Sequence, residues 1–228
     1  MQDLTTEFIR ELYDKYRTDL LQVRAEQLAL HDQGMRAQLD DIEAEVTYLL
    51  LREYRPGTVV EIGALHGWST TWILRALRDN GVGQLHSYDL VDHARHNVPA
   101  ELAEGRWTFV HGDVRDGARL PPDIDYLFMD AAHTAGFARW YLSAIMPTLA
   151  PGTPVSVHDV FHHAIALPFH EGAVVTRWLR DRGIGYFTAS APRSPDVNRE
   201  LARHKESLGL VTPIHTGSDN PMIFFNTN

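Results

Sequence analysis

Cysteine is absent from the 228-residue sequence, and its absence excludes two kinds of chemistry. Without thiols the chain forms no disulfide bonds, and no thiolate acts as a nucleophile or metal ligand. The sequence also lacks any run of about 18 apolar residues, the length that a membrane-spanning helix requires. Its polar N-terminus has no apolar signal-peptide core. These absences predict a cytoplasmic protein with no membrane partner.

Basic residues are in the minority, because 21 lysines and arginines face 30 aspartates and glutamates, for a net charge of −9. A nucleic-acid partner would need a basic face to neutralise its phosphates. We therefore expect no nucleic-acid partner. Apolar residues make up 44% of the chain, which is enough for a packed core. The length suits one α/β domain with an extension.

Glycine and proline are nearly absent from residues 4–55, where Gly34 is the single glycine and no proline occurs. Apolar residues recur at helical spacing in two segments, Leu4 to Val23 and Ile42 to Leu50. This pattern predicts an N-terminal helical extension over residues 1–57. The helices either cover a face of the sheet, cap a substrate pocket or form a dimer contact. Their apolar faces favour a homodimer.

From residue 58 onward strands and helices alternate, which predicts a parallel sheet in a second domain, 58–228. The predicted helices span Trp68–Asp79, Val91–Glu104, Phe137–Leu149, Gly172–Arg182 and Val197–Leu208. The predicted strands span Thr58–Ile62, Gln84–Asp89, Trp107–His111, Ile124–Asp130, Thr153–His158, Gly185–Ala189 and Met222–Asn226. The expected fold is therefore α/β, with a Rossmann-like, doubly wound and mostly parallel seven-stranded sheet.

The first predicted strand runs into a glycine-rich turn and then a helix. Glu61, Gly63 and Gly67 follow β-branched residues, and Ser69 opens the helix. A strand, a glycine turn and a helix N-terminus form a common binding site for nucleotide-like ligands. Glycine permits a sharp turn and close approach of a ligand to the backbone. The Gly-x-x-x-Gly spacing differs from the Gly-x-Gly-x-x-Gly of dinucleotide-binding folds, which argues against a dehydrogenase.

The string Glu61-x-Gly63-x-x-x-Gly67-x-Ser69-Thr70 resembles the first motif of class I S-adenosylmethionine-dependent methyltransferases. The resemblance implies S-adenosylmethionine as the cofactor, with the glycine turn beside its methionine part. It makes Glu61, Gly63, Gly67 and Ser69 candidate cofactor-binding residues. The last two predicted strands fit the antiparallel edge of the methyltransferase fold.

Two aspartates follow the next two strands. Asp89 ends the second strand, where its two oxygens can accept hydrogen bonds from two ribose hydroxyls. The alternative is that Asp89 caps the next helix. Asp113 follows the third strand in a Gly-Asp pair, and the resemblance implies that it binds the adenine amine. Asp113 could equally belong to an ordinary capped turn.

Ionisable residues also follow the fourth and fifth strands. Asp130 ends a hydrophobic strand near the expected reactive end of the cofactor, and His133 lies one turn beyond it. A charge at such a place is costly unless it is paired or metal-bound, which suggests that Asp130 is used. His133 suits removal of a substrate proton, although it could simply bond the helix start. His158 and Asp159 end the fifth strand, so both should meet Asp130 at one sheet edge.

This arrangement resembles catechol- and caffeoyl-coenzyme A-type O-methyltransferases and related enzymes that methylate antibiotic sugars and other secondary metabolites. The resemblance implies a divalent cation held by Asp130, His158 and Asp159, with His133 as the general base. His158 departs from the family, which has an oxygen ligand there. Oxygen ligands suit magnesium, whereas an imidazole favours manganese or another transition metal.

The sequence therefore predicts methyl transfer from S-adenosylmethionine to a small-molecule substrate, at a hydroxyl of a secondary metabolite. Asp130, His133 and His158 are the predicted catalytic residues. One alternative is a metal-independent N- or C-methyltransferase in which a histidine alone is the base. Another is a protein that binds a nucleoside ligand without methylating anything. At most one of His162 and His163 is expected to reach the site.

Overall fold

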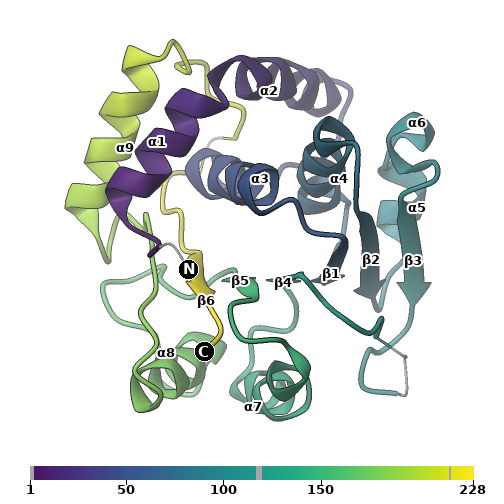
Figure 1. Ribbon diagram of the computed structural model, residues 1–228, viewed down its shortest axis with the longest axis vertical. Helices are drawn as coiled ribbons and strands as arrows, with labels where there is room; N and C mark the ends of the chain where they lie inside the picture. Colours follow the sequence, from purple (N-terminus) through teal and green to yellow (C-terminus); the bar gives the residue numbers. More distant parts are fainter. Residues whose placement is uncertain (1–2, 117–119, 216) are drawn as a thin grey trace.

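The computed structural model describes residues 3–116, 120–215 and 217–228, and it has three layers (Figure 1). A six-stranded sheet forms the middle layer, in the order β3-β2-β1-β4-β5-β6. Helices α3 and α4 lie over one face of the sheet, with α1, α2 and α9 beyond them (Figure 1). Helices α7 and α8 lie on the opposite face. The doubly wound α/β architecture predicted from the sequence is confirmed.

The strands β1 to β5 run parallel, and β6 pairs antiparallel with β5. The chain moves from β1 to β2 and β3 on one side and then returns to β4 on the other side of β1. This reversal leaves a crevice at the carboxyl ends of β1 and β4, where ligands of such sheets bind. The strands span Thr58–Ile62 (β1), Gln84–Asp89 (β2), Trp107–His111 (β3), Tyr126–Met129 (β4), Pro154–Val157 (β5) and Ile223–Asn226 (β6).

Proline explains where two predicted helices differ from the observed ones. Pro99 divides the predicted helix Val91–Glu104 into α5 and α6, because it holds Val98 in an extended conformation. Likewise α7 ends before Pro147, which lies in a separate 3₁₀ turn, η1. The helices span Thr6–Lys15 (α1), Arg17–Asp32 (α2), Asp41–Tyr54 (α3), Trp68–Asn80 (α4), His93–Asn97 (α5), Ala100–Ala103 (α6), Ala135–Ala144 (α7), Met146–Thr148 (η1), Glu171–Asp181 (α8) and Pro195–Ser207 (α9).

The prediction of seven strands is wrong, because the sheet has six strands in the part of the chain that the structure describes. The segment predicted as a strand at Gly185–Ala189 pairs with β6 only through an isolated bridge between Phe187 and Phe224. The next ladder position fails because other groups occupy the main chain of Met222. The Thr188 hydroxyl donates a hydrogen bond to the Met222 carbonyl, and the Met222 N–H donates one to the Glu43 carboxylate.

The N-terminal helices share a hydrophobic core with the sheet. Residues of α1 and α3, such as Phe8 and Leu49, belong to the same buried cluster as Val59 of β1 and Phe128 of β4. The apolar faces of these helices therefore cover one face of the sheet, which was one of the roles considered for them. The homodimer stays a prediction. In the described ranges, none of the helices is long and apolar enough to cross a bilayer.

Gly63 provides a test of how closely β1 and β4 approach each other. A Cβ added to Gly63 would lie 1.7 Å from the main-chain oxygen of Asp130, whereas one added to Gly81 would meet nothing within 4 Å. Both glycines have a positive φ, so replacement with alanine strains the backbone at both sites. We expect Gly63→Ala to lose about 2 kcal/mol more stability than Gly81→Ala, since only the former clashes. Denaturant unfolding measures the difference, and equal losses would contradict it.

Candidate active site

A cavity of about 730 Å³ lies at the carboxyl edge of the sheet, at the crevice between β1 and β4. Most of the residues singled out from the sequence line it. Its lining includes Gly63, Asp89, Asp113, Asp130, His133, His158 and Asp159. Glu61, Gly67 and Ser69 are not among the lining residues. The structure thus brings together residues from the ends of five different strands.

Glu61 is fully buried below the glycine turn instead of facing the cavity. Its carboxylate accepts hydrogen bonds from the hydroxyls of Ser69 at 2.6 Å, Thr70 at 2.8 Å and Ser87 at 2.5 Å. Burial raises the pKa of Glu61 to about 7; the three hydroxyls oppose this change, and the charge of Asp130 adds to it. Glu61 and Ser69 therefore join β1, β2 and α4 beneath the site.

The two glycines of the turn make room for close packing. Gly63 lies against the Asp130 carbonyl, which leaves no space for a side chain at this position. Gly67 precedes α4 with a φ of 89°, and a Cβ there would lie 2.7 Å from the Val98 side chain. Gly63 therefore permits contact with β4, and Gly67 permits contact with the segment after α5.

Asp89 holds the glycine turn in place from the end of β2. Its Oδ2 accepts hydrogen bonds from the main-chain N–H groups of Ala64 and Leu65, each at 2.7 Å. Its Oδ1 accepts one from Val91 at 3.0 Å. Each carboxylate oxygen can accept two hydrogen bonds, so Oδ1 can accept one more, and Asp89 lines the cavity. Asp89 is thus both a support of the turn and a candidate ligand-binding group.

Asp113 forms an ion pair with Arg115, and both residues line the cavity. The guanidinium donates to both carboxylate oxygens, at 2.6 Å from Nη2 and 2.9 Å from Nε. These hydrogen bonds lower the pKa of Asp113 to about 2. The guanidinium also lies 5.9 Å from the centroid of the Phe137 ring.

Two histidines that line the cavity lie between Asp130 and Asp159. His158 Nδ1 is 3.1 Å from Asp130 Oδ1 and 3.2 Å from Asp159 Oδ1. His133 Nε2 is 3.4 Å from Asp130 Oδ1 and 3.4 Å from Asp159 Oδ2. One nitrogen of each imidazole therefore faces the same pair of carboxylates. His133 and Asp159 both have positive φ values, a strained conformation that concentrates at functional sites.

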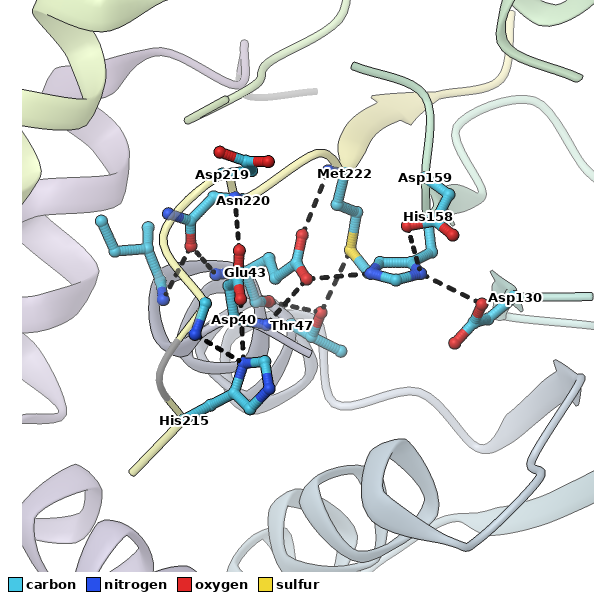
Figure 2. Close-up of polar contacts among 12 residues, drawn as sticks. Asp40, Glu43, Thr47, Asp130, His158, Asp159, His215, Asp219, Asn220 and Met222 are labelled. Carbon is cyan, nitrogen blue, oxygen red and sulfur yellow. Dashed lines mark hydrogen bonds and ion pairs between the residues drawn. The ribbon is translucent and has the colours of Figure 1, made fainter. Parts of the chain in front are cut away.

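The other nitrogen of each histidine meets a buried glutamate that the sequence analysis did not identify. His158 Nε2 donates to Glu43 Oε1 at 2.9 Å (Figure 2), and His133 Nδ1 donates to Glu171 Oε2 at 3.0 Å. The side chains of Glu43 and Glu171 are 1% and 2% exposed. The Asp40-x-x-Glu43 spacing of a capping box is readable in the sequence, but it does not reveal a histidine partner.

Charge pairing dominates the ionisation of this cluster. Burial lowers the pKa of His133, but Asp130 and Glu171 outweigh it and raise the value to about 10. The pKa of His158 is likewise raised by Asp130 and Glu43 despite burial. Burial opposes ionisation of Asp130, yet the two histidines hold the pKa of its carboxyl well below its usual range. Without another cation, pairing with these carboxylates therefore favours the charged form of both imidazoles.

The donor atoms of the cluster fit a divalent cation. Ligand atoms from Asp130, His133 and His158 all lie within 4.8 Å of one another. Asp159 lies beside both histidines. Metal-binding histidines usually donate their second N–H to a carboxylate or carbonyl, as both do here. Imidazole together with carboxylate is a donor set that suits a transition metal better than magnesium.

Three further histidines, His162, His163 and His215, lie near this cluster in the sequence or line the cavity. His162 Nε2 is 2.9 Å from Asp159 Oδ1, with 48% of its side chain exposed. His163 is exposed and does not line the cavity. His215, which the sequence analysis overlooked, does line it, and its Nδ1 lies 2.9 Å from Asp40 Oδ1. No local motif surrounds His215 that would have identified it.

Comparison with known proteins agrees with this geometry. Residues 60–160, from β1 to the end of the Asp130–Asp159 cluster, match the family model of a methyltransferase domain. This segment therefore forms a methyltransferase domain. The resemblance recognised in the glycine motif is therefore confirmed. None of the curated protein sequences matches the chain significantly.

Solved structures share the fold of the methyltransferase over most of its length. An O-methyltransferase from Bacillus cereus, in complex with S-adenosylhomocysteine, is 20% identical with a TM-score of 0.52, covering 92% of this chain and 91% of its own. The O-methyltransferase TomG from Streptomyces achromogenes, bound to S-adenosylmethionine, is 16% identical with a TM-score of 0.56 and 90% coverage of each chain. A methyltransferase from Geobacter sulfurreducens is 17% identical with a TM-score of 0.58, covering 90% and 88%.

The buried Glu61 makes the stability of the methyltransferase depend on pH. Its pKa in the folded protein, about 7, exceeds the ordinary value of 4.5, so folding favours the protonated form. The stabilisation is complete below the unfolded pKa and is lost as pH rises through the folded pKa. The glutamine in Glu61→Gln cannot ionise, so the stability of this variant should not fall in this way. Relative to wild type, its free energy of unfolding should rise by up to about 3 kcal/mol between low pH and a pH above neutrality.

Denaturant unfolding at about pH 5 and pH 8 measures this change. Glu11→Gln, at an exposed position of α1, is the matched control and should follow the wild type at both pH values. A difference between Glu61→Gln and wild type that stays the same at both pH values would contradict the assignment.

Proposed function

We propose that the protein transfers a methyl group from S-adenosylmethionine to a hydroxyl of a small molecule, with a divalent cation at Asp130, His158 and Asp159. One observation carries the proposal. The acid-and-histidine cluster lies directly beside the glycine turn, because Asp130 contacts Gly63 through its main chain. A cofactor at the turn would therefore present its reactive end to the cluster. His133 is the group we assign as base.

The cofactor half of the site consists of the glycine turn, Asp89 and Asp113. Asp89 Oδ1 can accept one more hydrogen bond, from a ribose hydroxyl. Gly63, Asp89 and Asp113 all line the cavity, and they lie at the ends of the neighbouring strands β1, β2 and β3. The structural neighbours that bind S-adenosylmethionine and S-adenosylhomocysteine support S-adenosylmethionine as the ligand. TomG is involved in tomaymycin synthesis, which supports a secondary metabolite as the acceptor.

In the proposed reaction the acceptor oxygen attacks the methyl carbon, the carbon–sulfur bond breaks, and the hydroxyl proton passes to His133 Nε2. The sulfonium is already activated, so the main task of the chain is to align the acceptor. A bound divalent cation would hold the hydroxyl and lower its pKa. Glu171 accepts from His133 Nδ1 and thereby directs Nε2 toward the cavity. The ring must lose its proton before it can act as a base.

Asp89 tests the cofactor assignment. Asp89→Ala removes the carboxylate that faces the cavity and supports the glycine turn, so the affinity for S-adenosylhomocysteine should fall at least about tenfold, the loss expected for a charge-assisted hydrogen bond. Isothermal titration calorimetry measures the affinity. Asp92→Ala, three residues along and outside the cavity lining, should bind like the wild type. Undiminished binding by Asp89→Ala would refute the ribose role.

His133 tests the base. His133→Gln should lower the rate of S-adenosylhomocysteine production about 100-fold or more, the usual contribution of general acid–base catalysis. The affinity of this variant for S-adenosylhomocysteine should stay within about twofold of the wild-type value, because the base acts in the transition state and does not contribute to cofactor binding. His163→Gln, at an exposed loop position, is the matched control. A loss of affinity with unchanged turnover would make His133 a binding residue.

The reaction and its cation are tested with a panel of hydroxylated aromatic and sugar acceptors, assayed with manganese, with magnesium and with a chelator. Methylation that disappears in chelator supports the proposal. Full activity in chelator would favour the metal-independent alternative, with a histidine base. Binding of S-adenosylhomocysteine without transfer to oxygen, nitrogen or carbon acceptors would favour the non-methylating nucleoside binder.

A further inference from the structure

Glu43 lies where the N-terminal helices, the end of β5 and the start of β6 meet (Figure 2). Its carboxylate accepts three hydrogen bonds from three separate segments. Oε1 accepts from Asp40 N at 2.9 Å and from His158 Nε2 at 2.9 Å. Oε2 accepts from Met222 N at 3.1 Å. Both carboxylate oxygens of Glu43 are therefore held by hydrogen bonds.

The C-terminal segment holds the start of α3 against the site. Asn220 Oδ1 accepts hydrogen bonds from the main chain of Ile42 at 3.1 Å and of Glu43 at 3.3 Å. In return, Asp40 Oδ2 accepts one from Asn220 N at 2.7 Å. Two N–H groups in the first turn of α3, those of Ile42 and Glu43, thereby gain the partner that the helix itself does not provide. The carboxylate of Glu43 is left directed toward His158 (Figure 2).

This contact decides which nitrogen of His158 faces the cavity. Because Nε2 donates to Glu43, Nδ1 is the nitrogen that lies 3.1 Å from Asp130 and 3.2 Å from Asp159. A ring turned over about its bond to Cβ would present a carbon to the aspartates. Carboxylates that hold a ligating histidine in this manner fix both its tautomer and its orientation.

We propose that Glu43 is a positioning residue, which orients His158 so that its Nδ1 binds the cation together with Asp130 and Asp159. The inference rests on the proposed function, since it assumes that cation. It gives the N-terminal extension a part in the active site in addition to covering the sheet. An imidazole held in this way also directs the site toward manganese, cobalt or zinc in preference to magnesium.

Helix capping alone does not require this arrangement. A capping box needs only the contact from the Glu43 side chain to Asp40 N, and glutamine provides that contact as well as glutamate. Asp40 N and Met222 N donate to different oxygens of Glu43, and glutamine has only one accepting oxygen. Glutamine therefore cannot accept both hydrogen bonds. A neutral amide is also a weaker acceptor for His158 than a carboxylate. Glu43→Gln therefore separates the two roles.

The test is calorimetric titration of the full chain, saturated with S-adenosylhomocysteine, with cobalt(II), manganese(II) and magnesium(II). Glu43→Gln should bind cobalt and manganese roughly 10- to 100-fold more weakly than wild type, the usual effect of losing a partner of a ligating histidine. Magnesium should be affected less. Glu45→Gln replaces another fully buried glutamate of α3, which pairs with Arg24 and Lys205 instead, and should bind cobalt like the wild type.

A double-mutant cycle distinguishes positioning from general destabilisation. In a His158→Asn background the ligating imidazole is gone, so adding Glu43→Gln should change cobalt affinity less than about twofold. A further tenfold loss in that background would overturn the proposal, as would equal cobalt affinities of wild type and Glu43→Gln. A wild type that binds S-adenosylhomocysteine but no cation would overturn both this role and the cation of the proposed function. S-adenosylhomocysteine affinity reports separately on the methyltransferase assignment.

Discussion

The carboxylate of Asp130 at the end of β4 is the charge around which the site is arranged. Its side chain is only 18% exposed, and a buried carboxylate without a partner would be strongly destabilising. His158 and His133 approach it with one ring nitrogen each, and their other nitrogens meet Glu43 and Glu171. Pairing therefore extends outward from one carboxylate to α3 on one side of the sheet and α8 on the other.

The main chain of the same residue joins the two halves of the cavity. Asp130 N donates to the carbonyl of Ile62 at 2.8 Å, and its own carbonyl lies where a Cβ of Gly63 would be. The glycine turn and the ionisable cluster thus meet without a side chain between them. Asp89 then fixes the far side of the turn from β2. A shift of β4 relative to β1 would disturb both halves together.

Much of this site follows from the order of the strands, and the rest depends on contacts that no local pattern records. Asp130, His158 and Asp159 were predicted to share an edge because carboxyl ends of parallel strands do so, and all three line the cavity. The motif that contains Glu61 predicted the turn but not that this side chain lies beneath it. The extra strand at Gly185–Ala189 could not be rejected, because its missing partner is the main chain of Met222, held by Glu43.

The sequence by itself determined the doubly wound sheet, the glycine turn and the methyltransferase motif. Each of these depends on local patterns, namely the alternation of strand and helix segments and the spacing of residues within one short motif. Only the tertiary structure decided which carboxylate meets which imidazole. Glu43 and His158 are 115 positions apart and meet because α3 packs across the sheet and residue 220 holds its first turn. Such a pair depends on the packing distance between elements, and hydrophobic periodicity specifies the buried face of a helix without specifying that distance.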